Sequence, residues 1–344
     1  MKKSVRKKKI LIAGAGITGI TLAYLLKKKF DVTVYEQMWE VGGLCVQDTY
    51  YGYDINRYGP HIFYTNKPEV MDIIRKWGGL RPYTHKVLSF VRGKLVPYPI
   101  NTETLKHFKD DKEALKEMMK PYHEKRWGKF KDKAPLPHVH PIKHGCGSHI
   151  MPKDNFFEHR WQGMPAIGYR EWFKKALQGV EVVTQRPFVY NDMERDIRSP
   201  MPEYNVFDLY IVTGYPDRFF NGEYGNLEAV GSSFHNIYIP NKRKYYPVAV
   251  VNFPEKEIPY LRVAEYKTLY NQRGNGTVLQ FEYPDYQLRF YPLNDEANQK
   301  IYAKYMKKKT KKKIIFAGRQ GKYKYMNMSE AMEDAIEIAK RLMK

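Results

Sequence analysis

The chain has 344 residues and a formal net charge of +22 at pH 7. This length is enough for a substantial core, which we expect to be divided between interleaved subdomains. Because there are only two cysteines, Cys45 and Cys146, a disulfide framework is excluded, and we expect a protein of a reducing, cytoplasmic compartment. No apolar run reaches the ~20 residues that a membrane-spanning helix needs.

Two lysine-rich runs, residues 2–9 and 307–313, supply much of the positive charge, and each immediately precedes an apolar segment. Basic proteins can bind nucleic acid, membrane surfaces or small anions. Because each run leads into a strand pattern, we favour solvated chain ends over a nucleic-acid site. The first apolar segment is interrupted by glycines and has no cleavage pattern, so we interpret it as a strand and not as a leader.

This first strand pattern belongs to a βαβ unit. Residues 10–13 form a short apolar run that leads into Gly14-Ala-Gly-Ile-Thr-Gly19, and an apolar-periodic helix pattern follows. Residues 32–35 then predict a second strand, which ends in Glu36. The glycine pattern alone is weak evidence, because such a turn also occurs in unrelated α/β domains. Here the strand, the helix and the acidic residue all stand where a dinucleotide-binding unit has them.

Each residue of this pattern has a physical role in such a unit. Gly14 permits the tight turn, Gly16 lets the backbone approach a pyrophosphate, and Gly19 lets helix and strand pack closely. The helix N-terminus offers N–H groups and the positive end of its dipole to the phosphates. Glu36 stands where a ribose hydroxyl would be bound. The unit therefore predicts a dinucleotide without identifying it.

The rest of the chain alternates helix and strand patterns. In chain order they predict a helix over residues 68–78, a hairpin of 86–91 and 94–98, helical structure over 102–128, a helix over 168–177, strands at 180–183, 209–214, 248–253, 260–265 and 313–317, and a final helix over 329–343. A second glycine pair, Gly42-Gly43, and two glycines that end strands, Gly214 and Gly318, favour FAD over NAD.

A set of short segments resembles UDP-galactopyranose mutases, and the segments occur in the order in which that family has them. They are Arg57-Tyr-Gly-Pro-His-Ile-Phe-Tyr-Thr65, Pro97-Tyr-Pro-Ile-Asn101, Glu124-Lys-Arg-Trp-Gly128, Arg160-Trp-Gln-Gly163, Asn252-Phe253, Pro259-Tyr-Leu-Arg262, Phe290-Tyr-Pro-Leu-Asn-Asp295, and Gly318-Arg319 with Tyr323-Lys-Tyr325. Any one of them would be poor evidence, but the ordered set spans nearly the whole chain and is specific.

The resemblance implies an α/β fold in which an FAD-binding Rossmann-like domain is interleaved with an antiparallel-sheet substrate domain and a reduced helical subdomain. The implied division assigns residues 1–80, 176–225 and 313–344 to FAD binding, 81–101 and 226–312 to the sheet domain, and 102–175 to the helical subdomain with a mobile loop. It also implies FAD that is active when reduced. NAD(P)H is a candidate external reductant, although the sequence has no second dinucleotide pattern.

The implied activity is the interconversion of UDP-galactopyranose and UDP-galactofuranose, which belongs to galactofuranose biosynthesis. In this family the N5 atom of reduced flavin attacks the anomeric carbon of the sugar and expels UDP, which permits ring opening and reclosure. Because the cofactor is the nucleophile, the protein needs no catalytic triad, and the sequence contains none. The departing diphosphate needs cations, for which guanidinium groups are well suited.

The resemblance also implies the site residues. Arg160 and Arg262 match the arginines that clamp the diphosphate, and residues 155–163 match a mobile loop. His61 matches a histidine beside the flavin. Substrate contacts are implied for Tyr122, Trp127, Tyr169, Asn252, Tyr291, Arg319, Tyr325 and His85. Cofactor contacts are expected for Gly14, Gly16, Thr18, Gly19, Glu36, Gly43, Leu44, His61, Ile62, Gly318, Asn327 and Met328.

Some features depart from the family pattern. The segment between Asn101 and Glu124 is much shorter than in bacterial members, where a helical bundle provides the usual dimer contact. We therefore expect a monomer, or a dimer through another surface. Tyr64 stands where the family usually has a second histidine, and His85 replaces a different polar side chain. His85 leaves open a mutase that acts on UDP-N-acetylgalactosamine or has relaxed sugar specificity.

Two further alternatives change the function. A redox FAD enzyme of the amine-oxidase type would share the fold, and a basic flavoprotein could bind nucleic acid through its lysine runs. The stretch from His138 to His149 is rich in histidine, but its spacing matches no standard zinc pattern. We interpret that stretch as a solvated loop, and we expect no metal.

Overall fold

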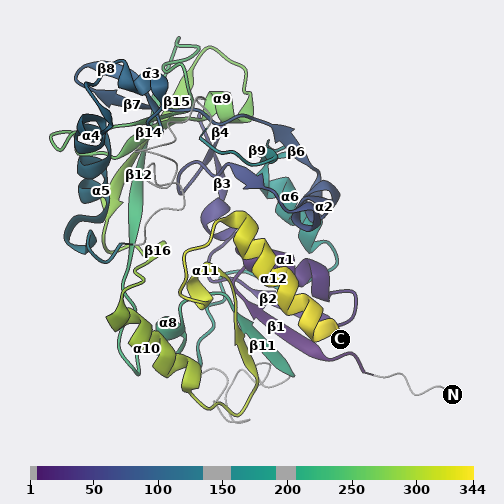
Figure 1. Ribbon diagram of the computed structural model, residues 1–344. Coiled ribbons are helices and arrows are strands. Elements are labelled where there is room, and N and C mark those ends of the chain that lie inside the picture. The colour runs from purple at the N-terminus through teal and green to yellow at the C-terminus, as the bar shows by residue number, and fades with distance from the viewer. Residues whose placement is uncertain (1–5, 135–155, 191–206) are drawn as a thin grey trace.

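The computed structural model describes residues 6–134, 156–190 and 207–344, and its two largest sheets lie in different parts of the molecule (Figure 1). Residues 2–5 of the first lysine run, the histidine-rich stretch 138–149 and the start of the expected mobile loop lie outside the described residues. The fold is mixed α/β, as the sequence predicts. Among the described helices, none combines the length and the apolar character that crossing a membrane requires.

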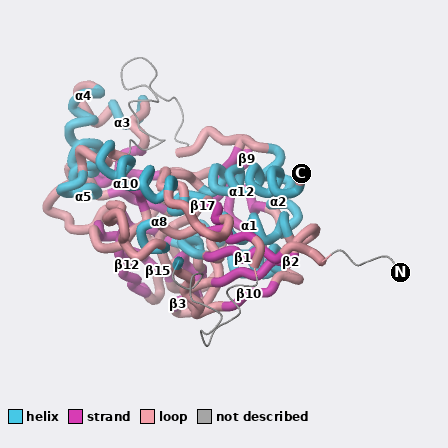
Figure 2. Tube along the Cα trace, turned by 90° about the horizontal axis from the view of Figure 1, so that it is seen from below, coloured by secondary structure: helices cyan, strands magenta, loops and turns pink. Residues whose placement is uncertain are grey.

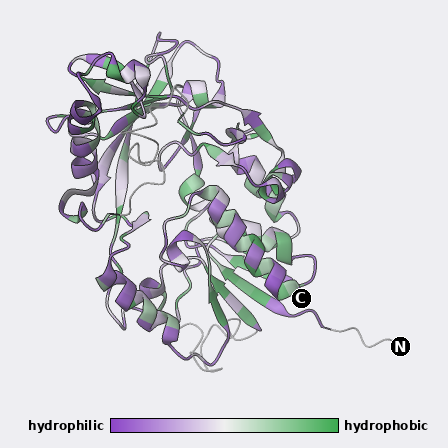
Figure 3. Ribbon diagram, in the orientation of Figure 1, coloured by the Kyte–Doolittle hydropathy of each residue, from purple (hydrophilic) through white to green (hydrophobic). Residues whose placement is uncertain are grey.

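A five-stranded sheet contains the predicted βαβ unit. Its strands, in spatial order, are β10 (Glu181–Val183), β2 (Asp31–Tyr35), β1 (Lys9–Ala13), β11 (Leu209–Val212) and β17 (Ile314–Phe316). All neighbouring strands run parallel. Parallel strands that are covered on both faces consist of consecutive apolar residues. Figure 3 shows β1 and β11 as hydrophobic. The sequence therefore carries a strong local signal for this sheet.

Helices cover one face of this sheet and pack against one another (Figure 2). They are α1 (Ile17–Leu26), α2 (Pro68–Trp77), α6 (Gly168–Leu177) and α12 (Met328–Met343). Successive side chains of a strand point to opposite faces, so β1 serves two cores. Ile10 and Ile12 belong to the core formed with these helices, whereas Leu11 and Ala13 belong to a second core. That second core includes residues of α8 (Pro216–Phe219) and α10 (Glu296–Lys307).

Two small sheets connect the two halves of the fold. Strands β3 (Gln47–Tyr50) and β4 (Tyr53–Asn56) form a hairpin. Strands β5 (Phe63–Thr65), β9 (Trp161–Pro165) and β6 (Leu80–Pro82) form an antiparallel sheet with β9 in the centre. Short helical segments lie at Gly43–Cys45 and at α11 (Gly318–Gly321).

The largest sheet has seven strands. They are, in spatial order, β16 (Tyr291–Pro292), β12 (Ala229–Ile239), β15 (Thr277–Asp285), β14 (Arg262–Glu265), β13 (Val250–Asn252), β7 (Val87–Val91) and β8 (Lys94–Tyr98). Neighbouring strands are antiparallel except for β13 and β7. Helix α9 (Tyr266–Tyr270) follows β14 directly. The long central strands β12 and β15 were not among the elements predicted from the sequence.

The helical structure expected over residues 102–128 is divided into short pieces. They are α3 (Thr102–Leu105), α4 (Asp111–Ala114), a π-helical turn (Leu115–Met119), α5 (Lys120–Trp127) and a 3₁₀ turn (Gly128–Phe130). Two N-caps explain the division, because each caps a new helix. The Asn101 side chain accepts a hydrogen bond from Thr104 N at 3.0 Å, and Asp110 accepts one from Glu113 N at 2.8 Å.

Candidate cofactor cavity and arginine cleft

A cavity of about 420 Å³ opens at the carboxyl ends of β1 and β11. This is the edge at which open α/β sheets bind ligands. Predicted cofactor residues that line the cavity are Gly14, Gly16, Thr18, Glu36, Gly43, Leu44, His61, Asn327 and Met328. Gly19, Ile62 and Gly318 are not among its lining residues. Arg319, which we expected to contact substrate, also lines it.

Glycine is required at several positions of the turn that opens α1. Gly14 has a φ of +105°, and a Cβ there would lie 2.1 Å from the Thr213 hydroxyl oxygen. A Cβ on Gly19 would lie 2.0 Å from the Gly14 carbonyl oxygen, so Gly19 serves packing and not ligand contact. A Cβ on Gly16 would meet nothing closer than 3.9 Å in the protein, which leaves backbone facing the cavity. The three glycines therefore have different physical roles.

Glu36 is buried at the end of β2 and lines the cavity. Its Oε2 accepts a hydrogen bond from Ala15 N at 2.7 Å, and its Oε1 accepts one from Met38 N at 2.9 Å. Burial raises the pKa of this carboxyl, and the backbone N–H donors oppose that rise. A carboxylate oxygen has more than one acceptor site, so a ribose hydroxyl can still be bound.

The opposite wall of the cavity includes the N-terminus of α12. Asn327 caps this helix, since its side chain accepts from Glu330 N at 3.0 Å while Glu330 Oε2 accepts from Asn327 N at 2.7 Å. Gly318 has a φ of +72°, and a Cβ there would lie 2.3 Å from the Thr18 hydroxyl oxygen. Gly318 therefore brings the segment after β17 against α1. Two helix N-termini, those of α1 and α12, consequently meet the same cavity.

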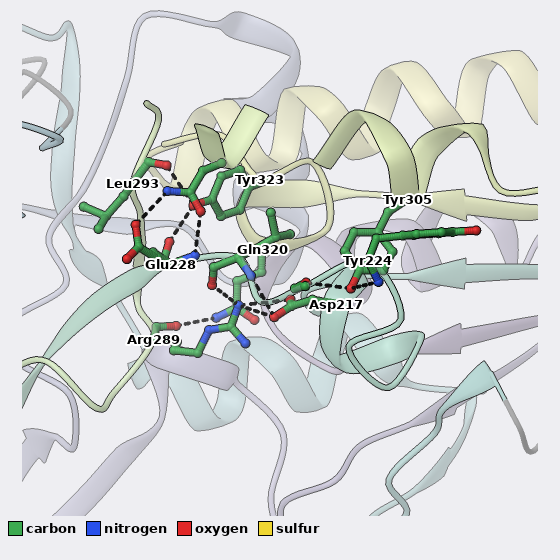
Figure 4. A network of polar contacts seen from close by, with 11 residues as sticks. Asp217, Tyr224, Glu228, Arg289, Leu293, Tyr305, Gln320 and Tyr323 are labelled. Carbon is green, nitrogen blue, oxygen red and sulfur yellow. Dashed lines mark hydrogen bonds and ion pairs between the residues drawn. The ribbon is translucent and has the colours of Figure 1, made fainter. Parts of the chain in front are cut away.

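A buried polar network supports the cavity where Arg289 lines it (Figure 4). Arg289 Nη2 lies 2.9 Å from Asp217 Oδ2 and 2.6 Å from the Leu227 carbonyl oxygen. Its guanidinium carbon lies 4.2 Å from the centre of the Tyr215 ring. Gln320 Nε2 donates to the Arg289 carbonyl at 3.3 Å. The sequence analysis did not single out Arg289, which has no glycine or motif signal.

The described residues fit an extended anionic dinucleotide such as FAD. Glycine backbone faces the cavity at Gly16 and Gly43, and two helix N-termini point their partial positive charge toward it. The Nε2 atom of His61 and the hydroxyl of Tyr215 are buried without a partner among the described residues, and both residues line the cavity. Such buried polar atoms are suited to a polar ligand.

A second group of residues, which we call the arginine cleft, surrounds the buried carboxylate of Glu282 on β15. Arg262, on the adjacent β14, donates from Nε to Glu282 Oε2. Arg126, on α5, lies with Nη1 3.3 Å from Glu282 Oε1, and the Ser232 hydroxyl donates to the same oxygen at 2.7 Å. Of these four residues, only Arg262 was predicted from the sequence as a site residue. Arg126 belongs to residues 124–128, which resemble the family, but no role was predicted for it.

Electrostatics in the arginine cleft favour the ionised forms. Burial would raise the pKa of Glu282, but Arg262 and Arg126 hold it below its ordinary value. Burial would lower the pKa of Arg262, but Glu282 raises it above its ordinary value. Both residues are therefore charged near neutral pH.

Aromatic rings cover these charged groups. Tyr291 and Tyr325 stack with ring centres 6.0 Å apart and planes at 14°. The guanidinium carbon of Arg319 lies 5.3 Å and 4.9 Å from these two ring centres. Trp127 meets Tyr291 edge to face at 6.2 Å, and it is buried. The charges of Arg262, Arg126 and Glu282 act on the Tyr122 hydroxyl, so we include Tyr122 in the arginine cleft.

The cofactor cavity and the arginine cleft meet at His61 and Arg319. Burial lowers the pKa of His61 to about 4, and the positive charges of Arg319 and Arg262 contribute to this. Gly59, close to His61 in sequence, lies against Arg262, since a Cβ on it would be 3.8 Å from an Arg262 Nη atom. A ligand in the cavity would therefore have the cationic cleft beside it at this point.

The structure places Arg160, expected to clamp the diphosphate, outside the arginine cleft. Its side chain is exposed, and its guanidinium carbon lies 4.6 Å from the centre of the Trp161 ring. Its backbone N–H donates to Asn66 Oδ1 at 2.7 Å. In this conformation, no contact among the described residues links Arg160 to Arg262 or to Glu282.

Tyr169 and His85, for which we expected substrate contacts, are both buried. Tyr169 has no exposed surface, and its hydroxyl donates to the His61 carbonyl at 2.5 Å, so it supports the cavity from behind. His85 is 4% exposed and packs against Phe156 and Phe157. Burial and the charge of Arg262 lower the pKa of His85 to about 3. Asn252 is buried and pairs in register with Arg262 across β13 and β14.

A family model and curated relatives identify the family of the chain. Residues 117–325, more than half of the chain, match the family model described as UDP-galactopyranose mutase, and residues 12–77 match an NAD(P)-binding Rossmann-like domain. The dTDP-fucopyranose mutase of Escherichia coli is 26% identical over 98% of both chains. A probable UDP-galactopyranose mutase of Klebsiella pneumoniae is 24% identical over 97% of this chain and 94% of its own. The crystal structure of a reduced UDP-galactopyranose mutase has a TM-score of 0.70 at 15% identity and covers 98% of this chain and 94% of its own.

Proposed function

The chain belongs to the UDP-galactopyranose mutase family, and from this premise we propose that it interconverts the pyranose and furanose forms of a nucleotide sugar. UDP-galactose is the first candidate substrate. The observation that carries the proposal is the junction of the dinucleotide cavity with the arginine cleft at His61 and Arg319. Such a junction would place a cofactor ring beside cations that suit a diphosphate.

We propose FAD as the cofactor. The backbone at Gly14, Gly16 and Gly43 would hold the pyrophosphate, and Glu36 would bind the ribose. Asn327 and Met328 would lie along the opposite side, at the N-terminus of α12. When bound and reduced, the flavin would supply the nucleophile, its N5 atom, that attacks the anomeric carbon of the sugar.

The chain's own residues would hold the substrate and stabilise the leaving group. Arg262, fixed by Glu282, would bind the diphosphate as its negative charge increases on bond cleavage. Tyr291 and Tyr325 would donate hydrogen bonds from their hydroxyl groups to the same diphosphate, and Tyr122 would stack on the base. His61 remains neutral at physiological pH, because its pKa is about 4. A neutral ring adds no further positive charge where the sugar becomes cationic.

Arg160 would act only after its segment moves. In the described conformation it is exposed, and closure would bring a further cation to the diphosphate while excluding water. The truncation Arg160→Ala is therefore expected to reduce turnover without loss of FAD.

A second candidate substrate is a dTDP-sugar, because the Escherichia coli relative that matches over 98% of both chains is a dTDP-fucopyranose mutase. UDP and dTDP sugars share the diphosphate and differ in the base and in the ribose 2′-hydroxyl. The arginine cleft would accept both, so the base pocket near Tyr122 would decide between them. UDP-N-acetylgalactosamine remains a third candidate.

The substrate can be identified by direct assay. Purified, FAD-containing protein would be reduced with dithionite and incubated separately with UDP-galactofuranose, dTDP-fucofuranose and the furanose form of UDP-N-acetylgalactosamine. We expect chromatography to show the matching pyranose from UDP-galactofuranose with the highest kcat/KM. Faster turnover of the dTDP-sugar would transfer the assignment to the second candidate. If none of the three is converted, the mutase proposal is wrong.

A further inference from the structure

Arg126 is the second arginine at the Glu282 carboxylate, and its environment suggests more than structural support. Its side chain is 16% exposed, and its Nη1 atom lies 3.3 Å from Glu282 Oε1. Its guanidinium carbon lies 4.8 Å from the centre of the Tyr291 ring and 5.8 Å from that of Trp127. Stacking on aromatic rings keeps the planar guanidinium in a fixed orientation.

Only one nitrogen of the Arg126 guanidinium forms a hydrogen bond with a described residue. Among the described residues, Glu282 is the hydrogen-bonding partner of Arg126, and that contact uses Nη1. The Nε and Nη2 atoms are not among the buried polar atoms that lack a partner, so they are open to the cleft. A guanidinium with two accessible N–H directions and a fixed plane is suited to two oxygens of one phosphate group.

The charges around Arg126 do not balance without an anion. Arg126 and Arg262 place two positive charges against the single carboxylate of Glu282, and the Arg319 guanidinium stacks on the same Tyr291 ring as that of Arg126. Glu282 is shared between two of the guanidiniums, with Ser232 donating to it as well. Partly buried charge that is not balanced is unfavourable, and an anionic ligand would relieve it.

We infer that Arg126 is a further substrate-binding residue, which binds the diphosphate of the nucleotide sugar beside Arg262 while Glu282 fixes both guanidiniums. The inference rests on the proposed function, since it assumes a nucleoside diphosphate in the cleft. It also assigns distinct stages to the arginines. Arg126 and Arg262 are in place in the described conformation, so they bind the diphosphate first, whereas the exposed Arg160 acts only after closure.

The test measures nucleotide binding separately from turnover. FAD-containing protein would be titrated separately with UDP, dTDP and uridine, and tryptophan fluorescence would report binding. Replacement Arg126→Met keeps the side-chain length and removes the charge, and Arg126→Lys keeps the charge without the planar fork. We expect Arg126→Met to raise the Kd for UDP at least about tenfold, with Arg126→Lys intermediate and with the weak uridine affinity unchanged.

The controls separate a binding role from a structural one. Arg75→Met removes an exposed arginine that pairs with Asp72 on α2, and it should leave the Kd for UDP unchanged. Thermal melting and flavin absorbance would establish that each variant is folded and holds FAD. Equal loss of UDP and uridine binding would mean that Arg126 only supports the base pocket, and an unchanged Kd for UDP would also overturn the inference. If the wild-type protein binds neither UDP nor dTDP, the proposed function itself fails, and the inference fails with it.

Discussion

The end of the cofactor cavity at β1 and α1 is formed by glycine backbone, although charged and aromatic side chains line it elsewhere, whereas the arginine cleft is formed by charged and aromatic side chains throughout. In the cavity, Gly14, Gly16 and Gly43 bring main chain to the ligand, and one short segment supplies the first two. In the arginine cleft, Arg126 and Glu282 stand 156 residues apart and meet through tertiary structure. The cavity therefore depends on steric fit within a local unit, and the cleft depends on charges that separate segments bring together.

The two regions should respond differently to substitution. A side chain added in the cavity should displace the cofactor, while the arginine cleft should lose turnover and charge balance with the cofactor retained. Four sets of substitutions test this contrast.

The largest effect is expected at the glycines of the cavity. Gly16→Ala places a methyl group where protein atoms leave room, 3.9 Å from the nearest, and its φ of −79° suits alanine. The methyl group would occupy the approach of the pyrophosphate, so we expect purified protein without FAD but with nearly normal stability of the apoprotein. Gly19→Ala meets the Gly14 carbonyl at 2.0 Å and should lower the melting temperature as well. Normal flavin content in Gly16→Ala would contradict this account of the cavity.

The next effect compares the half-buried Arg262 with the exposed Arg160. Arg262→Ala leaves the buried Glu282 with one of its two cations, and removing a partner of a buried ion pair costs about 3–5 kcal/mol. Turnover should fall by orders of magnitude with FAD retained.

Arg160→Ala should change the free energy of unfolding by less than about 0.5 kcal/mol, because the Arg160 side chain is exposed, and should lower kcat instead. Urea unfolding and steady-state kinetics measure both. Loss of FAD in either variant would mean that we have misplaced that arginine.

Acid should lower the free energy of unfolding through His61 and His85. The pKa of His61 is lowered to about 4 and that of His85 to about 3, against an ordinary value near 6.5. Between pH 6.5 and these values the unfolded chain binds protons that the folded chain does not, so stability falls as the pH falls. Each histidine contributes a slope of about 1.4 kcal/mol per pH unit.

The variant His85→Phe tests this pH dependence. Phenylalanine suits the aromatic surroundings of His85 and removes one titrating group whose Nδ1 is buried without a partner among the described residues. Urea unfolding from pH 4 to pH 7 should show a slope smaller by about one proton. An unchanged slope would mean that His85 is protonated in the folded protein.

The smallest effect is expected from Tyr169→Phe. The variant removes the hydrogen bond from the Tyr169 hydroxyl to the His61 carbonyl, which costs about 1 kcal/mol in a typical case. Because that carbonyl belongs to a residue that lines the cavity, we also expect a small shift of the flavin absorbance spectrum. A large rise in KM with an unchanged spectrum would instead restore the substrate contact first expected for Tyr169.

The cavity could be predicted from sequence because its signal is local. Gly14, Gly19 and Glu36 belong to one βαβ unit, and each is constrained by neighbours near it in the chain or by one adjacent strand. Arg262 was predicted through its match to a family segment. Glu282 lies on β15, a strand that was not predicted from the sequence, so its role as the shared counter-ion could not be foreseen.

The burial of Tyr169 and His85 shows the same limit. Tyr169 matches a substrate position of the family, but it lies on the buried face of α6 and has no exposed surface. His85 is enclosed by aromatic residues of the segment at Phe156–Phe157, which is distant in sequence. Sequence position alone does not show which side of a helix or strand faces a cavity when the packing partners lie far along the chain.

The most direct test of the account asks whether the flavin acts without net redox change. FAD-containing protein would be incubated with UDP-galactofuranose in the oxidised state and after reduction by dithionite, with flavin absorbance and sugar products followed together. The account predicts UDP-galactopyranose from the reduced protein alone, over many turnovers, with the flavin still reduced at the end. Reduction of the oxidised flavin by the nucleotide sugar, with an oxidised sugar product and no isomer, would contradict it.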